Sequence, residues 1–108
     1  MTEKTYNGWT NYETWRVALW MDNEHGTYSD RCEMAEFIWR RSDEDNEDRS
    51  RDARIKMSDW VESYVRDMVP NSLPGFISDL VGSALSDVDW REIADNWLSE
   101  QEGYEAQS

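Results

Sequence analysis

The chain has 108 residues, of which 24 are acidic and 11 basic, so its formal net charge is -13. This length suits a single domain, but 38% hydrophobic residues and a high charge require disorder to be considered first. Seven Trp, five Tyr and two Phe argue against disorder, because burying them would supply roughly 2,000–3,500 Å² of core. Composition therefore predicts a small folded domain with an aromatic interior and a negative surface.

The charge and the residue types exclude several classes of function. A negative surface repels phosphates, which excludes ordinary DNA or RNA binding and docking on anionic membranes. No apolar run approaches the roughly 18 residues of a membrane span, and the N-terminus lacks signal-peptide features. One cysteine, Cys32, and one histidine, His25, cannot form a zinc site from nitrogen and sulfur ligands. We therefore expect a cytoplasmic protein without a cofactor or metal, in which Cys32 is a buried structural thiol.

The first predicted helix spans about 11–22, with Thr10 and Glu13 as its capping box. Apolar residues on almost every side of it predict a central helix. Gly26 is expected to adopt a left-handed conformation after the last turn. Helical spacing places the aromatic residues of this region mainly in the core, with the first of them expected nearest the surface: Trp9, Tyr12, Trp15 and Trp20.

Two further helices are predicted before Pro70. Thr27 and Asp30 resemble a capping pair for a helix over 28–41. A polar loop over 42–50 separates it from a helix over 50–69, which Pro70 ends. The inward residues of the first are expected to be Tyr28, Cys32, Ala35, Ile38 and Trp39, and those of the second Ala53, Met57, Trp60, Val61, Tyr64, Val65 and Met68.

The last two predicted helices follow the prolines. Pro74 opens a helix over 74–86, which is expected to bury Phe76, Ile77, Leu80, Val81, Ala84 and Leu85. Asp89 and Glu92 form a capping box for a helix over 90–100, with Val88 as a hydrophobic staple. The buried side of this last helix is expected to be Ile93, Ala94, Trp97 and Leu98.

No segment alternates at period two, so the predicted fold is all-α. We expect a compact single-domain bundle of about five helices with a Trp-rich core, formed by residues 1–100. Residues 101–108 are expected to form a mobile acidic tail.

Two segments resemble a known group of proteins. Residues 7–15 read Asn-Gly-Trp-Thr-Asn-Tyr-Glu-Thr-Trp, and residues 83–94 form a second block with the run Asp-Val-Asp-Trp-Arg-Glu. These blocks, together with residues 18–23, resemble a family of small acidic proteins of bacteriophages, mobile elements and some prokaryotes. The resemblance implies a phage or prokaryotic origin. It carries no established activity and therefore no catalytic residue.

No motif indicates an enzyme or a metal site. The chain lacks a phosphate-binding G-x-x-x-x-G-K-[ST] loop, a nucleophile elbow and an H-E-x-x-H zinc motif. A calcium loop starting at Asp43 would need glycine at Asp48 and glutamate at Arg54, and both positions fail. The six bases between Arg40 and Lys56 interleave with acids, which favours internal ion pairs over a phosphate site.

The distribution of charge carries the functional hypothesis. Residues 1–56 hold 13 acids and 9 bases, whereas residues 57–108 hold 11 acids and 2 bases. Self-repulsion of this kind costs stability, so the acidity has a use elsewhere. The expected partner-binding residues are the uncompensated carboxylates Asp79, Asp87, Asp89, Glu92, Asp95, Glu100 and Glu102, and the second choice is the acidic loop Asp43, Glu44, Asp45, Glu47 and Asp48.

These residues predict a non-enzymatic acidic protein that binds and inhibits a host protein that handles nucleic acid or serves defence. A net charge of -13 equals the charge of roughly 22 Å of duplex DNA, which permits inhibition by DNA mimicry. A homodimer would present twice that charge. The alternative is an accessory or structural protein whose acidity serves solubility or salt tolerance. Nine Arg against two Lys fit that alternative as well.

Overall fold

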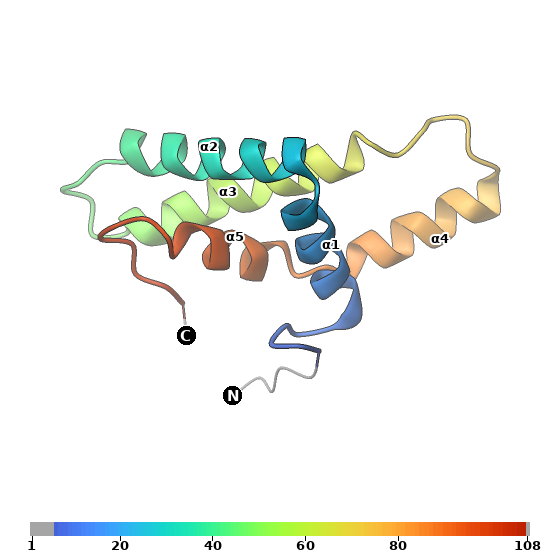
Figure 1. The fold of residues 1–108 in the computed structure, drawn as a ribbon, viewed down its shortest axis with the longest axis horizontal. Coiled ribbons are helices and arrows are strands. Elements are labelled where there is room, and N and C mark those ends of the chain that lie inside the picture. Colours follow the sequence, from blue (N-terminus) through green and yellow to red (C-terminus); the bar gives the residue numbers. More distant parts are fainter. Residues whose placement is uncertain (1–5, 108) are drawn as a thin grey trace.

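Five helices make up most of residues 6–107, which are the residues that the computed structural model describes (Figure 1). They are α1 (Tyr12–Asn23), α2 (His25–Arg41), α3 (Arg49–Arg66), α4 (Gly75–Ser86) and α5 (Trp90–Leu98). Between residues 6 and 107 no strand forms, so the prediction of an all-α domain is confirmed. Residues 1–5 and 108, which belong to the predicted domain and tail, lie outside the described residues. No helix of the described chain is long and apolar enough to cross a membrane.

The core is built around α5, the shortest helix. Its five buried residues, Trp90, Ile93, Ala94, Trp97 and Leu98, follow the i, i+3, i+4, i+7, i+8 spacing of one helical face. This face packs mainly on α3, and also on α2 and α1. The segment predicted to be central, α1, buries only Thr14, Ala18 and Met21. The prediction of its central position was therefore wrong, whereas the four residues predicted to be buried in the last helix are confirmed.

A tight turn precedes α1. Asn7 and Gly8 both have positive φ, 48° and 90°, which suits the Asn-Gly pair of a type I′ turn. The turn lets Tyr6 and Trp9 exchange two backbone hydrogen bonds, and it directs the Tyr6 ring onto the rings of Tyr12 and Trp15, with centroids 5.1 and 5.2 Å away. The first half of the Asn-Gly-Trp-Thr-Asn-Tyr-Glu-Thr-Trp segment therefore forms a turn closed by aromatic contacts.

The first turns of α1 and α5 are joined by hydrogen bonds. Asn11 caps α1 by accepting from the Thr14 amide at 2.9 Å, and its own amide donates to the Asp87 carbonyl at 2.7 Å. The Thr14 hydroxyl donates to Asn11 Oδ1 at 2.6 Å and accepts from the Asp89 amide at 2.8 Å. The two sequence blocks, 76 residues apart at Asn11 and Asp87, thus meet in one junction.

Two predicted caps were wrong. The cap of α1 is Asn11, and Glu13 lies one residue inside the helix. Gly26 and Thr27 lie inside α2, because a single residue, Glu24, separates α1 from α2. The Thr27 hydroxyl donates to the carbonyl oxygens of Met21 and Glu24, at 2.8 and 3.0 Å, and so satisfies the end of α1 instead of beginning a helix. Of the last predicted capping box one half is confirmed, since Asp89 Oδ1 accepts from the Glu92 amide at 3.0 Å. The other half was wrong, because the Asp89 amide donates to Thr14 Oγ1 and Glu92 Oε1 accepts from the Thr10 amide.

The helix predicted to bury six apolar residues, α4, buries none of them. Phe76 is 68% exposed and Leu80 is 64% exposed, and only Leu85, near the end of the helix, packs against the core. The linker over residues 67–74 contains two prolines and carries α4 beyond the end of α3, where Figure 1 shows it projecting from the bundle. The prediction of a helix was therefore correct, whereas the prediction that its apolar side chains are buried was wrong.

The aromatic residues are divided between the core and the surface. Trp39, Trp90 and Trp97 are buried, whereas Tyr12, Trp20 and Tyr28, which were expected inside, are 46%, 42% and 43% exposed. Trp9, expected near the surface, is half-buried against the core. Arg31 and Thr27 in α2, which were not expected inside, are buried. The inward stripe predicted for α3 is confirmed at Ala53, Met57 and Val61.

Replacing Thr14 by valine tests the junction between α1 and α5. The substitution keeps the shape of the fully buried side chain but leaves the Asp89 amide without its acceptor. We expect a loss of about 1–3 kcal/mol in the free energy of unfolding, measured by urea denaturation. Thr14→Ser retains the hydroxyl and should lose less. Equal stability of Thr14→Val and the original protein would contradict the role of this hydroxyl.

Candidate functional site

Four of the seven carboxylates proposed as a binding face make contacts within the fold. Asp89 caps α5, and Glu92 Oε1 accepts a hydrogen bond from the Thr10 amide at 3.1 Å. Asp95 and Glu100 each pair with a buried arginine, as described next. These four side chains therefore stabilise the structure, and reversing their charge would disturb it.

Asp95 holds the C-terminal segment in place. Its Oδ1 accepts hydrogen bonds from Arg54 Nε at 3.2 Å, from the Tyr104 hydroxyl at 2.5 Å and from the Gln107 amide at 2.9 Å. Arg54 also donates to the Tyr104 hydroxyl and the Glu105 carbonyl. Burial and the hydrogen bond to Asp95 raise the pKa of Tyr104 above its ordinary value. Residues 101–107, expected as a mobile tail, are thus bound to α3 and α5.

Arg31 ties Glu100 to α1. Its side chain is only 7% exposed, and it donates to Asp22 Oδ1 at 3.0 Å and to Glu100 Oε2 at 2.6 Å. Its guanidinium lies over the rings of Tyr28 and Trp97, 4.8 and 5.1 Å from their centroids. Two carboxylates around one buried cation neutralise a charge that would otherwise oppose burial. Glu100 therefore serves a buried arginine although its own side chain is 56% exposed.

The other three proposed residues, Asp79, Asp87 and Glu102, are exposed. No ion pair involves their carboxylates within residues 6–107. They lie apart in the fold, on α4, at its C-terminal cap and in the C-terminal segment. The structure does not bring the seven residues together into one face.

The second-choice residues form an ordered loop between α2 and α3. Asp43 Oδ1 accepts from the Asp45 amide and Asn46 Oδ1 accepts from the Asp48 amide, both at 2.9 Å. Asn46 also donates to Asp52 at 2.9 Å, which ties the loop to α3. Such side-chain turns leave the carboxylates of the loop directed to solvent. Within the described chain, no three carboxylate, thiol or imidazole groups gather as a metal site.

The C-terminal segment adds two carboxylates beside this loop. Trp39 Nε1 donates to the Glu102 carbonyl at 2.9 Å, and the Glu105 amide donates to Ser50 Oγ at 2.9 Å. Trp39 and Ser50 flank the loop, so the segment contacts residues on both sides of it. Figure 1 shows the segment beside the start of α3, at the end of the molecule away from α4. We call this group the acidic end: Asp43, Glu44, Asp45, Glu47, Asp48, Glu102 and Glu105.

The basic residues near the acidic end have partners of their own. Arg49 covers the Trp39 ring at 3.7 Å and donates to Ser42 Oγ and the Trp39 carbonyl. Arg51 pairs with Asp48 at 3.2 Å, and Arg54 is held by Asp95. Among residues 6–107, six of the seven carboxylates of the acidic end therefore have no ion pair. These six carboxylates lie beside two guanidinium groups, those of Arg41 and Arg49, that also have no ion pair among the described residues.

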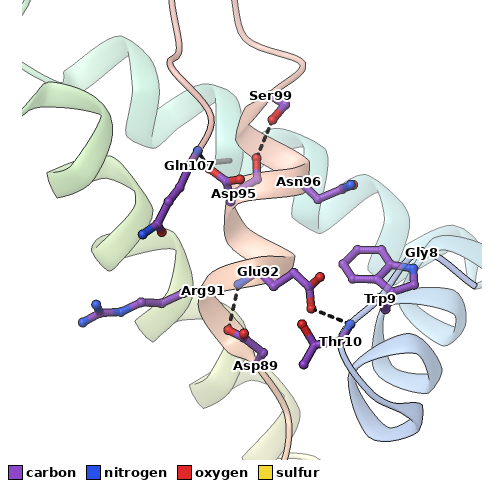
Figure 2. Close-up of a pocket in the computed structure, with 10 residues that line it drawn as sticks. All are labelled: Gly8, Trp9, Thr10, Asp89, Arg91, Glu92, Asp95, Asn96, Ser99 and Gln107. Atoms are coloured by element: carbon purple, nitrogen blue, oxygen red, sulfur yellow. Dashed lines mark hydrogen bonds between the residues drawn. The ribbon is translucent and has the colours of Figure 1, made fainter. Parts of the chain in front are cut away.

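An open hollow of about 580 Å³ lies between the N-terminal turn and α5 (Figure 2). Its carboxylates are Asp89, Glu92 and Asp95, which have the structural contacts given above. Ser99, at the C-terminal end of α5, has a hydroxyl in the lining, and this hydroxyl donates to the Asp95 carbonyl at 2.7 Å. Figure 2 shows these groups directed at neighbouring backbone atoms. These lining groups thus serve the helix junction.

Sequence patterns missed two features of the surface. The acidic end depends on contacts between residues 39–50 and 102–105, which no local pattern signals. The exposure of α4 had one signal, namely that Asp79 is the only charged residue in a helix of 12. A bundle helix normally carries a charged outer face. The absence of that face is common to buried helices and to helices that pack on another molecule.

Comparison with known protein families gives a match over most of the chain. A model described as "Family of unknown function (DUF7249)" matches residues 2–102. No curated protein and no solved structure matches the chain.

Replacing Asp95 by asparagine tests whether this carboxylate acts within the fold. The Arg54 side chain is 10% exposed and would lose its ion pair. We expect a loss of about 1.5–3 kcal/mol in the free energy of unfolding, together with faster amide hydrogen exchange in residues 101–107. Asp79→Asn removes the same charge from an exposed position and should change stability by less than about 0.5 kcal/mol. Equal effects of the two substitutions would contradict the assignment.

Proposed function

Because the chain belongs to DUF7249, a family of unknown function, we propose a role from its surface chemistry. The protein is a non-enzymatic, phage-type acidic protein that binds and inhibits a host nucleic-acid-handling or defence protein. It occupies the basic surface on which that protein binds nucleic acid. The observation that carries this proposal is the acidic end, where six carboxylates lack an ion pair among the described residues.

The distribution of charge limits the kind of mimicry. The molecule is 48 Å long, and duplex DNA of that length would carry roughly 28 charges, about twice the net charge of this chain. The six unpaired carboxylates correspond to roughly 10 Å of duplex. The geometry therefore supports a compact acidic patch that covers a few phosphate-binding side chains, rather than an extended imitation of a DNA strand.

The order of the acidic end favours recognition. Its loop is held by side-chain turns, and its C-terminal segment by hydrogen bonds to Trp39, Ser50 and Arg54. Carboxylates on an ordered backbone lose little conformational freedom on binding, so less affinity is lost to ordering. A basic partner would be attracted over a distance of about the Debye length, which makes the association sensitive to salt.

A second candidate is an accessory protein whose acidity serves solubility or salt tolerance. The observation that favours it is the presence of exposed carboxylates outside the acidic end, among them Glu24, Glu33, Asp59 and Asp67. Charge spread over a surface keeps molecules apart without recognising a partner. The two candidates differ in whether the position of the carboxylates matters.

Two variants with the same net charge separate these functions. The first neutralises the acidic end by Glu44→Gln, Asp45→Asn, Glu47→Gln and Glu102→Gln. The second, a matched control, carries Glu24→Gln, Glu33→Gln, Asp59→Asn and Asp67→Asn. We expect immobilised original protein and the control to retain a nucleic-acid-binding protein from a bacterial lysate at low salt, and the acidic-end variant to retain at least tenfold less.

The retained protein should be released by about 0.5 M salt and by added duplex DNA, because both compete for the same basic surface. Mass spectrometry of the released fraction identifies it. Equal retention by the two variants would contradict a located site. Retention of no protein at any salt concentration would favour the accessory role.

A further inference from the structure

An open hollow of about 480 Å³ lies between α2 and α3, two helices that pack on each other. Four of its lining residues follow one face of α2 and two follow one face of α3: Asp30, Glu33, Met34 and Phe37, and Trp60 and Tyr64. Small-molecule sites have volumes of roughly 300–1,000 Å³ and join aromatic side chains to a few polar groups. From this lining we infer that the hollow, here called the aromatic groove, binds a small methylated ammonium cation.

Three rings and a thioether form the apolar part of the aromatic groove. Trp60 and Tyr64 have ring centroids 4.9 Å apart, and their ring planes are inclined by 44°. Both pack against the core, as Met34 does, whereas Phe37 is 50% exposed. Aromatic rings carry negative charge density on their faces, and Trp attracts cations most strongly. The groove therefore combines apolar surface with rings that suit a positive charge.

Two carboxylates add formal negative charge to the groove. Asp30 Oδ2 accepts a hydrogen bond from the Tyr64 hydroxyl at 2.6 Å, which holds this carboxylate beside the rings. Glu33 lies one turn further along α2 and is exposed. Among residues 6–107 neither carboxylate has an ion pair. The groove thus holds two negative charges without a counter-charge.

No basic side chain of the described residues lines the groove. Arg41 lies over the Phe37 ring at 4.7 Å, but it lines an adjoining hollow instead. Lys56, one turn before Trp60 on α3, is exposed and is not part of the lining. Within residues 6–107 no arginine lies over the ring of Trp60 or Tyr64. A ligand that complements this site therefore carries a positive charge.

The shortage of hydrogen-bond acceptors selects the kind of cation. Arg31, Arg49 and Arg54 lie over rings of this fold, and each also donates to two or more acceptors. A guanidinium has five N–H donors that need such acceptors. In the groove only the two carboxylates accept, and Asp30 already accepts from Tyr64. A methylated ammonium has few N–H donors or none, so the rings and one carboxylate satisfy it.

The same charge pattern favours a free molecule over a lipid headgroup. A phosphatidylcholine headgroup carries its phosphate a few atoms from the ammonium. No basic residue lines the groove to receive that phosphate, and Asp30 and Glu33 would repel it. A free cation such as choline meets only opposite charge here. Cosedimentation of the protein with phosphatidylcholine vesicles, abolished by choline, would overturn this assignment of the source.

Nuclear magnetic resonance of the ¹⁵N-labelled protein with choline tests the site without any host protein, so its outcome is independent of the proposed function. We expect saturable shifts of the Trp60 indole N–H and of the Met34, Phe37 and Tyr64 amides, with a millimolar Kd. At equal ionic strength, uncharged 3,3-dimethyl-1-butanol and guanidinium should each bind at least about fivefold more weakly. Equal binding of the uncharged analogue, tighter binding of guanidinium, or shifts confined to other residues would overturn the proposal.

Replacing the tryptophan ring tests its contact with the cation. Trp60→Leu keeps an apolar side chain but removes the ring, and it should raise the choline Kd at least about fivefold. Trp60→Phe retains a ring and should lose less affinity. The matched control Trp20→Leu removes a ring of α1 that is 42% exposed and should leave the Kd within about twofold. Far-UV circular dichroism verifies that the variants remain helical. Equal Kd values for Trp60→Leu and Trp20→Leu would contradict the site.

Replacing a carboxylate tests the electrostatic part without removing packed surface. Asp30→Asn keeps an acceptor for the Tyr64 hydroxyl but removes the charge, and it should raise the choline Kd at least about threefold. Asp59→Asn removes the same charge from an exposed position of α3 outside the lining and should have no measurable effect. Binding of 3,3-dimethyl-1-butanol should be the same in both variants. An Asp30→Asn variant that binds choline as tightly as the original protein would refute the role of this carboxylate.

Discussion

The hydroxyl of Thr14 bonds to groups at the starts of two helices, and the rest of the structure depends on this junction. It donates to the Asn11 cap of α1 and accepts from the amide of Asp89, the cap of α5. A helix start leaves amide groups without partners inside its own backbone, so buried starts need partners from elsewhere. Because each start here supplies part of the other's hydrogen bonding, α5 enters the bundle at a fixed point and its five buried residues reach α3, α2 and α1.

The carboxylates of the chain fall into two groups that its net charge does not distinguish. Part of it neutralises arginines inside the fold, as Asp22 and Glu100 do for Arg31 and Asp95 does for Arg54. A buried guanidinium without such a partner would cost several kcal/mol, so these carboxylates are required for folding. The remainder is exposed, and the docking of residues 101–107 gathers six unpaired carboxylates at the acidic end. Only this second group is available to a partner.

The molecule is therefore polarised along its length. The acidic end and the uncharged face of α4 lie at opposite ends of the long axis. Charge acts on a basic partner over several ångströms of solvent, whereas an apolar face acts only on direct contact. The two surfaces therefore differ in chemistry and are separated in space.

The amino-acid sequence by itself determined the helices, because period and proline positions act locally: Pro70 and Pro74 bound the linker before α4, and the stripe Ala53, Met57 and Val61 faces the core as predicted. It also indicated the cap at Asp89. The tertiary structure alone decided which helix is central. Both α1 and α5 carry apolar residues, and only contacts between distant segments determine which of the two helices is buried. It likewise decided that Asp95 and Glu100 pair with buried arginines, whereas Glu44 and Glu47 have no ion pair among the described residues. A carboxylate has the same local pattern in either role, and what differs is the residue that the folded chain places beside it.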